Sequence, residues 1–199
     1  MYTKIVTLAV VILLLAPTMS LSADRTCGPA TQVKIMTPFQ AGRLAPGLTA
    51  SSRGNGKCFA ASAASAGRPD AWRCSIENAI HDPCFQNVMG DPNLLACPES
   101  PWSTNVVLVT LTSPLPTEHS SREWKKDTLP WALELTNGER CSLFTGATAP
   151  IAGMRINYGC PGGFIVVGDI DRSESAWRVF FQGEKSFNLE QVEVAVAWY

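Results

Sequence analysis

A histidine beside a carboxylate is the first feature of this sequence that could do chemistry. His81 and Asp82 are adjacent and stand just before Pro83 and Cys84, and such a pair is the usual starting point for general-base catalysis. A hydrolase would also need a nucleophile, and the sequence has no G-x-S-x-G elbow to supply a serine. The same two residues suit an exposed position or a local cap. A small secreted hydrolase using His81 and Asp82 is therefore an alternative hypothesis for the function.

A pair of alternate aspartates is the second such feature. Asp169 and Asp171 lie in the string GDIDRSESAW, where we expect a hairpin loop. Alternate carboxylates can bind Ca²⁺ through oxygen, and they could also serve the hydrolase hypothesis. Aspartate and serine are equally the ordinary residues of turns. We expect no metal or other cofactor, and Asp169 and Asp171 are the positions where calcium would bind if that expectation failed.

Four residues before a cysteine suit ligand binding better than catalysis. Arg68, Asp70, Trp72 and Arg73 place two guanidinium groups around an acid and an indole, next to Cys74. Arginine offers bidentate contacts to anions and tryptophan offers a flat face, so the group could bind an anionic or sugar ligand. The alternative is structural, with Arg and Asp paired to each other beside a disulfide and Trp72 in the core.

The sequence is rich in tryptophan, with six residues in 199. Trp131, Trp177 and Trp198 follow the alternation of expected strands, so we expect them in the core. Trp102 and Trp124 lie outside such patterns, and they are the tryptophans that remain for recognition. Two of them exposed on one face would favour a binding function.

The cysteines indicate a disulfide framework. The chain has seven cysteines but neither a C-x-x-C pair nor histidines at matching spacing for zinc, so disulfides are expected before metal binding. Six of them are expected to form the framework, since Cys27 lies in the loose N-terminal stretch. Six cysteines allow fifteen pairings, and we expect sequence neighbours to pair: Cys58 with Cys74, Cys84 with Cys97, and Cys141 with Cys160. The remaining Cys27 would be free or would join two chains in a dimer.

The first residues have the pattern of a secretory signal peptide. Lys4 precedes an apolar run over residues 5–16, which is shorter than the roughly 20 residues that a membrane-spanning helix needs. Small residues at positions 20, 22 and 23 suit cleavage, so we expect residues 1–23 to be removed. No later segment is apolar and long enough to span a membrane. The predicted location is secreted or periplasmic.

Strand patterns dominate the chain after Cys97. Residues 106–112 are β-branched and apolar, Trp131, Leu133 and Leu135 alternate with other residues, and Asn137-Gly138 predicts a type I′ hairpin to the strand that follows. Further strands are expected at residues 155–158, 164–167 and 177–181. In the last strand, at residues 192–198, Val192, Val194, Val196 and Trp198 are expected to share one face.

The sequence thus predicts a mainly β fold, an antiparallel sandwich or small barrel stapled by disulfides. We expect a short helical segment near residues 70–80, although alternation over residues 71–76 leaves a strand open there. Residues 24–56 are rich in Gly, Pro, Ser and Thr and are expected to form a loose N-terminal lead. Residues 57–199 would then form a single β domain.

Several strings in the chain resemble exported bacterial domains of unknown function. They are RPDAWRC at residues 68–74, N-x-I-x-DPCF at 78–85, PWALEL-x-NG-x-RC at 130–141 and NYGC at 157–160. The resemblance covers residues 56–199. It implies that the six later cysteines and these tryptophans belong to a shared framework, and it carries no activity.

The balance of charge excludes some partners. The formal net charge is −1, which is too far from basic to predict binding to nucleic acid or to an anionic membrane. The hypothesis favoured by the sequence is a secreted or periplasmic binding or interaction module without catalysis, in which loops on a β scaffold recognise a partner. An inhibitor or an envelope structural protein is a further alternative.

Overall fold

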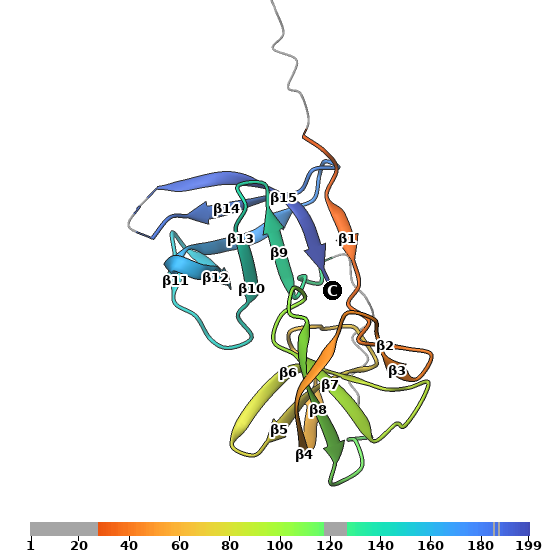
Figure 1. The fold of residues 1–199 in the computed structure, drawn as a ribbon. Helices are drawn as coiled ribbons and strands as arrows, with labels where there is room; N and C mark the ends of the chain where they lie inside the picture. The colour runs from red at the N-terminus through yellow and green to blue at the C-terminus, as the bar shows by residue number, and fades with distance from the viewer. Residues whose placement is uncertain (1–27, 118–126, 185, 187) are drawn as a thin grey trace, which may run out of the picture.

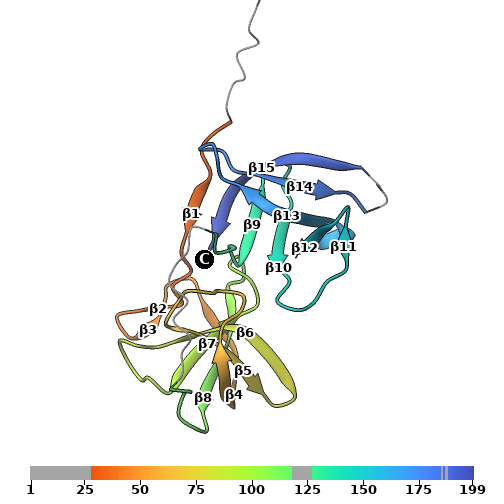
Figure 2. The ribbon, with the colours of Figure 1, turned by 180° about the vertical axis from the view of Figure 1, so that it is seen from behind.

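The structure is a computed structural model that describes residues 28–117, 127–184, 186 and 188–199. It confirms a mainly β chain with small barrels and three disulfides. Figures 1 and 2 show two β units, one above the other, with β1 (Gln32–Lys34) running from the upper unit toward the lower one. The expected signal peptide, Cys27 and Trp124 lie outside the described residues. Within the described part, no helix is long and apolar enough to cross a membrane.

The lower unit is a closed barrel. Its strands follow one another as a meander, and the ring closes where the first strand pairs in parallel with the last. Gly56 lies in the long first strand, and a Cβ there would come within 2.7 Å of the carbonyl oxygen of Ser75, so glycine permits this close approach of neighbouring strands. The strands are β4 (Thr49–Ala61), β5 (Ala71–Ile76), β6 (Ala79–Gln86), β7 (Leu94–Pro98) and β8 (Asn105–Leu111).

The upper unit is also a closed ring, because its last strand pairs with its first as well as with its predecessor. The strands are β9 (Ala132–Leu135), β10 (Arg140–Leu143), β12 (Met154–Gly159), β13 (Ile165–Asp171), β14 (Arg178–Gln182) and β15 (Leu189–Trp198). Shorter elements complete the fold: β1 beside β15, β11 (Pro150–Ile151) beside β12, the hairpin of β2 (Phe39–Gln40) and β3 (Arg43–Leu44), and the 3₁₀ turn η1 (Pro161–Gly163).

The helical segment expected near residues 70–80 is wrong. β5 and β6 form an antiparallel hairpin there, turning at Glu77, whose φ is +54°. Trp72, Cys74 and Ile76 are buried on alternate positions of β5, which is the period of a strand, and Cys74 lies directly opposite its disulfide partner Cys58. The strand alternative that alternation left open is the one adopted.

The described part of the expected loose lead contributes strands. Residues 28–56 contain β1, β2, β3 and the first half of β4, and the expected boundary at residue 57 falls inside β4. Their polar composition did not indicate strands because β1 is exposed along its whole length and most of β4 up to Asn55 is exposed on its outer side. Residues 57–199, expected to form one domain, are divided between the two barrels.

The hairpin at Asn137-Gly138 is confirmed in position and differs in type. Gly138 has φ of +91°, whereas Asn137 has no positive φ, and a type I′ turn needs positive φ at both central residues. The amide of Gly138 donates a hydrogen bond to the carbonyl oxygen of Leu135 at 3.0 Å. The amide of Leu135 donates one to the carbonyl oxygen of Glu139 at 2.9 Å. The loop is therefore a three-residue connection in which glycine occupies the left-handed position after the turn.

The three disulfides pair as expected from the sequence. Two of them crosslink neighbouring strands of the lower barrel, and the third ties β10 to the end of β12 in the upper barrel. A loop of about fifteen residues closed by a disulfide contributes about 3 kcal/mol in the chain-entropy account. Each barrel therefore has its own covalent support. The pairs are Cys58–Cys74, Cys84–Cys97 and Cys141–Cys160.

An apolar cluster joins the two barrels. The rings of Phe85 in β6 and Trp131 beside β9 meet edge to face with centroids 6.1 Å apart, and Met36 packs with them from the segment after β1. All three side chains are buried. Burial of this kind contributes about 25 cal/mol for each Å² of apolar surface removed from water, so the junction stabilises the arrangement of the barrels.

Candidate functional site

His81 and Asp82 do not meet in one cleft. They are consecutive residues of β6, and the side chains of consecutive strand residues point to opposite sides. His81 lines a hollow of about 520 Å³ together with Arg53 and Glu77, whereas the side chain of Asp82 is only 7% exposed. The geometry therefore lacks the contact that an acid and a base at one site would need.

Asp82 holds the turn at residues 62–65. Its carboxylate accepts a hydrogen bond from the hydroxyl of Ser62 at 2.5 Å and from the amides of Ala63 and Ala64 at 3.2 and 3.4 Å. Arg73 Nε lies 3.8 Å away. Burial raises the pKa of Asp82 above its ordinary value, and the hydrogen bond from Ser62, the two amides and the charge of Arg73 only partly offset that effect. These contacts describe a capping carboxylate.

The binding group expected around Arg68 is divided between the barrel interior and the junction. Arg68 is buried and forms a bidentate pair with Asp70, with contacts of 3.0 and 2.6 Å. Its guanidinium carbon lies 4.4 Å from the ring centre of Phe85. Trp72 is 4% exposed in the core of the lower barrel, and Arg73 faces Asp82. The structural alternative describes all four residues.

Asp169 and Asp171 lie on β13, not in a loop, and both are exposed. Asp169 lines a cavity of about 500 Å³ with Asp127 and Arg172. Asp171 accepts the amide of Ser173 at 3.0 Å, and hydrogen bonding by Ser173 lowers the pKa of Asp171. No group of three or more His, Cys, Asp or Glu side chains in the described part of the chain is arranged to hold a metal ion.

A different group of residues comes together on the outer face of the upper barrel. It spans four neighbouring strands, β1, β15, β9 and β10, and we call it the Glu134 row. Lys34 lies directly opposite Trp198 across β1 and β15, and Glu134 lies directly opposite Arg140 across β9 and β10. Trp102 joins the row from the connection between β7 and β8 of the lower barrel.

Glu134 is the centre of this row. Its Oε1 accepts a hydrogen bond from Nε1 of Trp198 at 2.8 Å and another from Nε1 of Trp102 at 2.9 Å. Its Oε2 is 3.9 Å from Nε of Arg140. The Glu134 side chain remains 25% exposed and that of Arg140 remains 57% exposed. One carboxylate oxygen is thus committed to two indoles while the other faces a solvent-exposed base.

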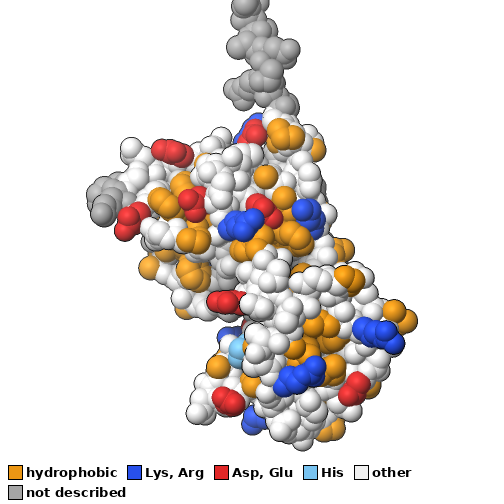
Figure 3. Space-filling model, viewed as in Figure 1, with side chains coloured by type: hydrophobic (Ala, Val, Ile, Leu, Met, Phe, Trp, Pro, Cys, Tyr) orange, Lys and Arg blue, Asp and Glu red, His pale blue; other side chains and the backbone are white. Residues whose placement is uncertain are grey.

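Each indole of the row carries a cation over its ring. Lys34 Nζ lies 5.0 Å from the ring centre of Trp198, and the guanidinium carbon of Arg140 lies 5.4 Å from that of Trp102. Both distances are within the range in which a cation is attracted to the face of an indole. Figure 3 shows this face of the upper barrel as hydrophobic side chains with basic and acidic ones set among them.

The electrostatics of the row keep Glu134 charged. Burial alone would raise the pKa of Glu134, but hydrogen bonds from Trp198 and Trp102 and the positive charges of Arg140 and Lys34 outweigh it, and the pKa lies below its ordinary value. A carboxylate that stays ionised and half-exposed can accept further hydrogen bonds from a ligand. The row therefore combines acceptors, donors and aromatic surface in one place.

Sequence reasoning found only part of this site. From the sequence we expected Trp102 to be available for recognition. In the structure it belongs to the row and is half-buried there. We expected Trp198 in the core, whereas this indole lies on the outer face. Glu134 occupies an ordinary polar position in the alternation of β9, so its type and spacing gave no signal. The packing of Trp102 against another barrel could not be inferred from local patterns.

Comparison with known proteins found no family model, curated protein or solved structure that matches the chain. The resemblance to exported bacterial domains stays a prediction. The geometry of the described residues is therefore what supports a functional assignment.

Proposed function

We propose that the protein is an exported saccharide-binding module that acts without catalysis and holds its ligand on the Glu134 row. The observation that carries the proposal is the carboxylate of Glu134, which has a lowered pKa, is partly exposed and is fixed by the N–H groups of two half-buried indoles. Export is supported by the leader pattern and by the three disulfides, which persist in oxidising compartments.

The chemistry of the row matches the two sides of a sugar ring. Sugar rings have C–H faces that stack on aromatic side chains, and they have hydroxyl groups at their edges that hydrogen-bond to charged groups. Trp102 and Trp198 supply aromatic surface at low cost in conformational entropy, because an indole has few rotatable bonds. Glu134 accepts hydrogen bonds from hydroxyl groups, and Lys34 and Arg140 donate hydrogen bonds to hydroxyl oxygens.

The fixed geometry favours binding. Each indole is held by a hydrogen bond to Glu134, so little motion of the rings would be lost when a ligand docks, and preorganisation of this kind increases affinity. A catalytic function finds less support, since His81 and the carboxylates of Asp82, Asp169 and Asp171 are spread over three separate places.

The proposal is tested by calorimetric titration of the oxidised protein, residues 24–199, with soluble tetrasaccharides of stated composition: cellotetraose, chitotetraose and tetragalacturonate. Binding of at least one, with a change in tryptophan fluorescence, is expected. The Trp198→Phe variant should bind that ligand about tenfold less tightly, since it loses the indole N–H and part of the stacking surface. Binding that Trp198→Phe leaves unchanged, or the absence of binding to all three sugars, contradicts the proposal.

A further inference from the structure

We infer that the saccharide is anionic, with acid groups on separate rings that pair with Lys34 and Arg140. This inference rests on the proposed function and adds the class of ligand. The shared chemistry is a sugar chain bearing carboxylate or sulfate groups. The argument starts from the charges of the Glu134 row, which contains two bases and a single acid.

One oxygen of the row's acid is already satisfied. Oε1 of Glu134 receives both indole N–H groups, at 2.8 and 2.9 Å, and its low pKa keeps it ionised without a ligand proton. Its attraction for Arg140 is weak, because the closest approach is 3.9 Å and the base is 57% exposed. A half-exposed ion pair of this kind contributes little, so Arg140 can turn to another anion at small cost.

Lys34 is less committed still. Its side chain is exposed on β1, and among the described residues no carboxylate lies within ion-pair distance of it. Its ammonium group is held over Trp198 by the attraction of the ring. The row therefore presents two cations that share the single charge of Glu134 and lie over aromatic faces, and an anionic ligand would offer each of them a closer charged partner.

The spacing indicates a chain of sugars in place of one. Lys34 and Arg140 stand on strands separated by two others, β15 and β9. Three interstrand spacings and an offset of two residues along β10 put their backbones roughly 16 Å apart. Each cation has an indole beside it, which repeats the combination of base and stacking face twice along the row. An oligosaccharide with an acid on rings some distance apart matches this repeat, whereas a monosaccharide could reach only one half.

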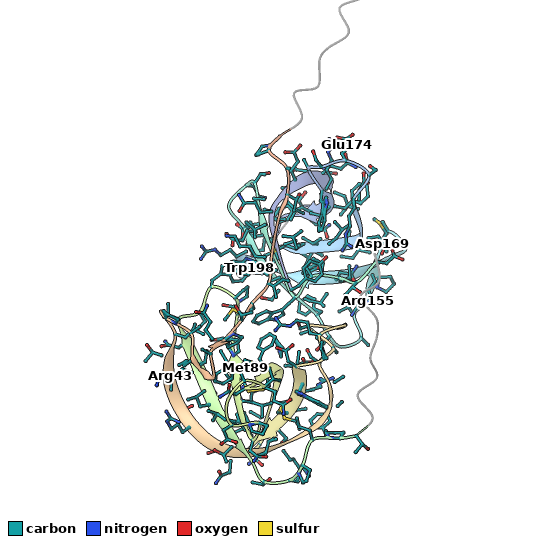
Figure 4. All side chains as sticks on the ribbon, turned by 90° about the vertical axis from the view of Figure 1, so that its right-hand side faces the viewer. Arg43, Met89, Arg155, Asp169, Glu174 and Trp198 are labelled. Atoms are coloured by element: carbon teal, nitrogen blue, oxygen red, sulfur yellow. A yellow bond between two sulfur atoms is a disulfide. The ribbon has the colours of Figure 1, made fainter. Side chains whose placement is uncertain are left out.

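The experiment compares charged and neutral tetrasaccharides on single variants. Tetragalacturonate carries carboxylates, a chondroitin sulfate tetrasaccharide carries sulfates as well, and cellotetraose is neutral. Lys34→Gln and Arg140→Gln each remove one cation while keeping polar side chains of similar length. Arg43→Gln is the matched control, because Arg43 is an exposed cation on β3 of the lower barrel, and Figure 4 labels it apart from Trp198.

We expect an acidic tetrasaccharide to bind at least about tenfold more tightly than cellotetraose, and each of Lys34→Gln and Arg140→Gln to weaken its binding by roughly tenfold. Added salt should weaken the binding of the wild-type protein, because exposed charges are screened, and Arg43→Gln should leave it unchanged. A preference between tetragalacturonate and the sulfated sugar identifies the acid group. Circular dichroism of each variant establishes that it is folded.

Two results overturn the inference, and they differ in what else they affect. If cellotetraose binds as tightly as the acidic sugars, or Lys34→Gln and Arg140→Gln change nothing while Trp198→Phe weakens binding, the row does not recognise acid groups on the sugar, and the proposed function stands. If no sugar binds, or binding is insensitive to Trp198→Phe, the inference and the proposed function both fail.

Discussion

Oε1 of Glu134 and Nε1 of Trp198 are 2.8 Å apart, and the same oxygen lies 2.9 Å from Nε1 of Trp102. Trp198 belongs to the last strand of the upper barrel, whereas Trp102 belongs to a connection of the lower barrel. One carboxylate oxygen therefore links the two barrels through charge-assisted hydrogen bonds, which are shorter and stronger than neutral ones. The same contact makes Glu134 important for stability as well as for the proposed binding.

Replacing Glu134 with Gln should destabilise the protein by about 1 kcal/mol, because the amide oxygen still accepts hydrogen bonds from the two indole N–H groups but carries no charge. The measurement is denaturant unfolding followed by circular dichroism. Glu139→Gln is the control, since Glu139 lies in the same hairpin and forms no ion pair with a described residue, and it should change stability by less than about 0.5 kcal/mol. Equal losses in the two variants would contradict a special role for Glu134.

The pH dependence of this effect has a definite sign. The folded-state pKa of Glu134 is lower than its ordinary value of 4.5, so the folded state favours the ionised carboxylate. Its contribution is fully present above pH 4.5 and is lost as the pH falls through the folded-state pKa. The difference in unfolding free energy between the wild type and Glu134→Gln should therefore be constant near neutral pH and shrink in acid. A difference that grows in acid would refute this assignment.

Asp82 should show the opposite sign. Burial raises the folded-state pKa of Asp82 above its ordinary value of 3.8, so the folded state binds the proton more tightly than the unfolded chain. This carboxyl should add stability as the pH falls from neutral through its folded-state pKa toward 3.8. The Asp82→Asn variant lacks this gain in stability at low pH. Its side-chain NH₂ group also takes the place of an oxygen that accepted a backbone N–H, and the loss of that hydrogen bond should cost about 1 kcal/mol at pH 7.

The check on Asp82 is unfolding of both proteins between pH 7 and pH 4. The difference in unfolding free energy between the wild type and Asp82→Asn, which we call the stability gap, should increase as the pH falls. Asp171→Asn is the matched control, because Asp171 is exposed, and its gap should follow no such trend. A gap that is independent of pH for Asp82→Asn would show that burial does not govern this carboxyl.

The local features of the fold could be predicted from sequence because they depend on near neighbours. The disulfide from Cys141 to Cys160 and the hairpin at Gly138 join residues less than twenty positions apart, where spacing and turn chemistry give a signal. The closure of the two barrels could not be predicted in this way. It pairs Thr49 with Asn105 and Ala132 with Trp198, and no local pattern specifies such distant partners.

The candidate site was missed for a related reason. Val192, Val194, Val196 and Trp198 were expected to share a face, but a register shift between Val194 and Val196 interrupts the alternation. After that irregularity Ala197 enters the core with Val194, and Trp198 turns to the outer face. A bulge reverses the facing of every later residue in a strand, so the periodicity of β15 predicted the wrong side for its tryptophan.

Arg68→Lys should be the most damaging conservative substitution at the junction between the barrels. Nη1 of Arg68 donates to the carbonyl oxygens of Met36 and Tyr199, while Nε and Nη2 hold Asp70 as a bidentate pair. A lysine ammonium cannot reproduce the planar fork that serves these acceptors together. Because the site is buried, the acceptors left unpaired should cost about 3 kcal/mol.

Arg73→Lys is the matched control for that loss. Arg73 is 32% exposed and approaches Asp82 only to 3.8 Å, so lysine can replace it at a cost of less than about 1 kcal/mol. Denaturant unfolding of the two variants, with intact disulfides, should therefore separate them by about 2 kcal/mol. If Arg68→Lys proves as mild as Arg73→Lys, the guanidinium of Arg68 does not hold the junction, and the apolar contact of Phe85 with Trp131 must account for the packing of one barrel on the other.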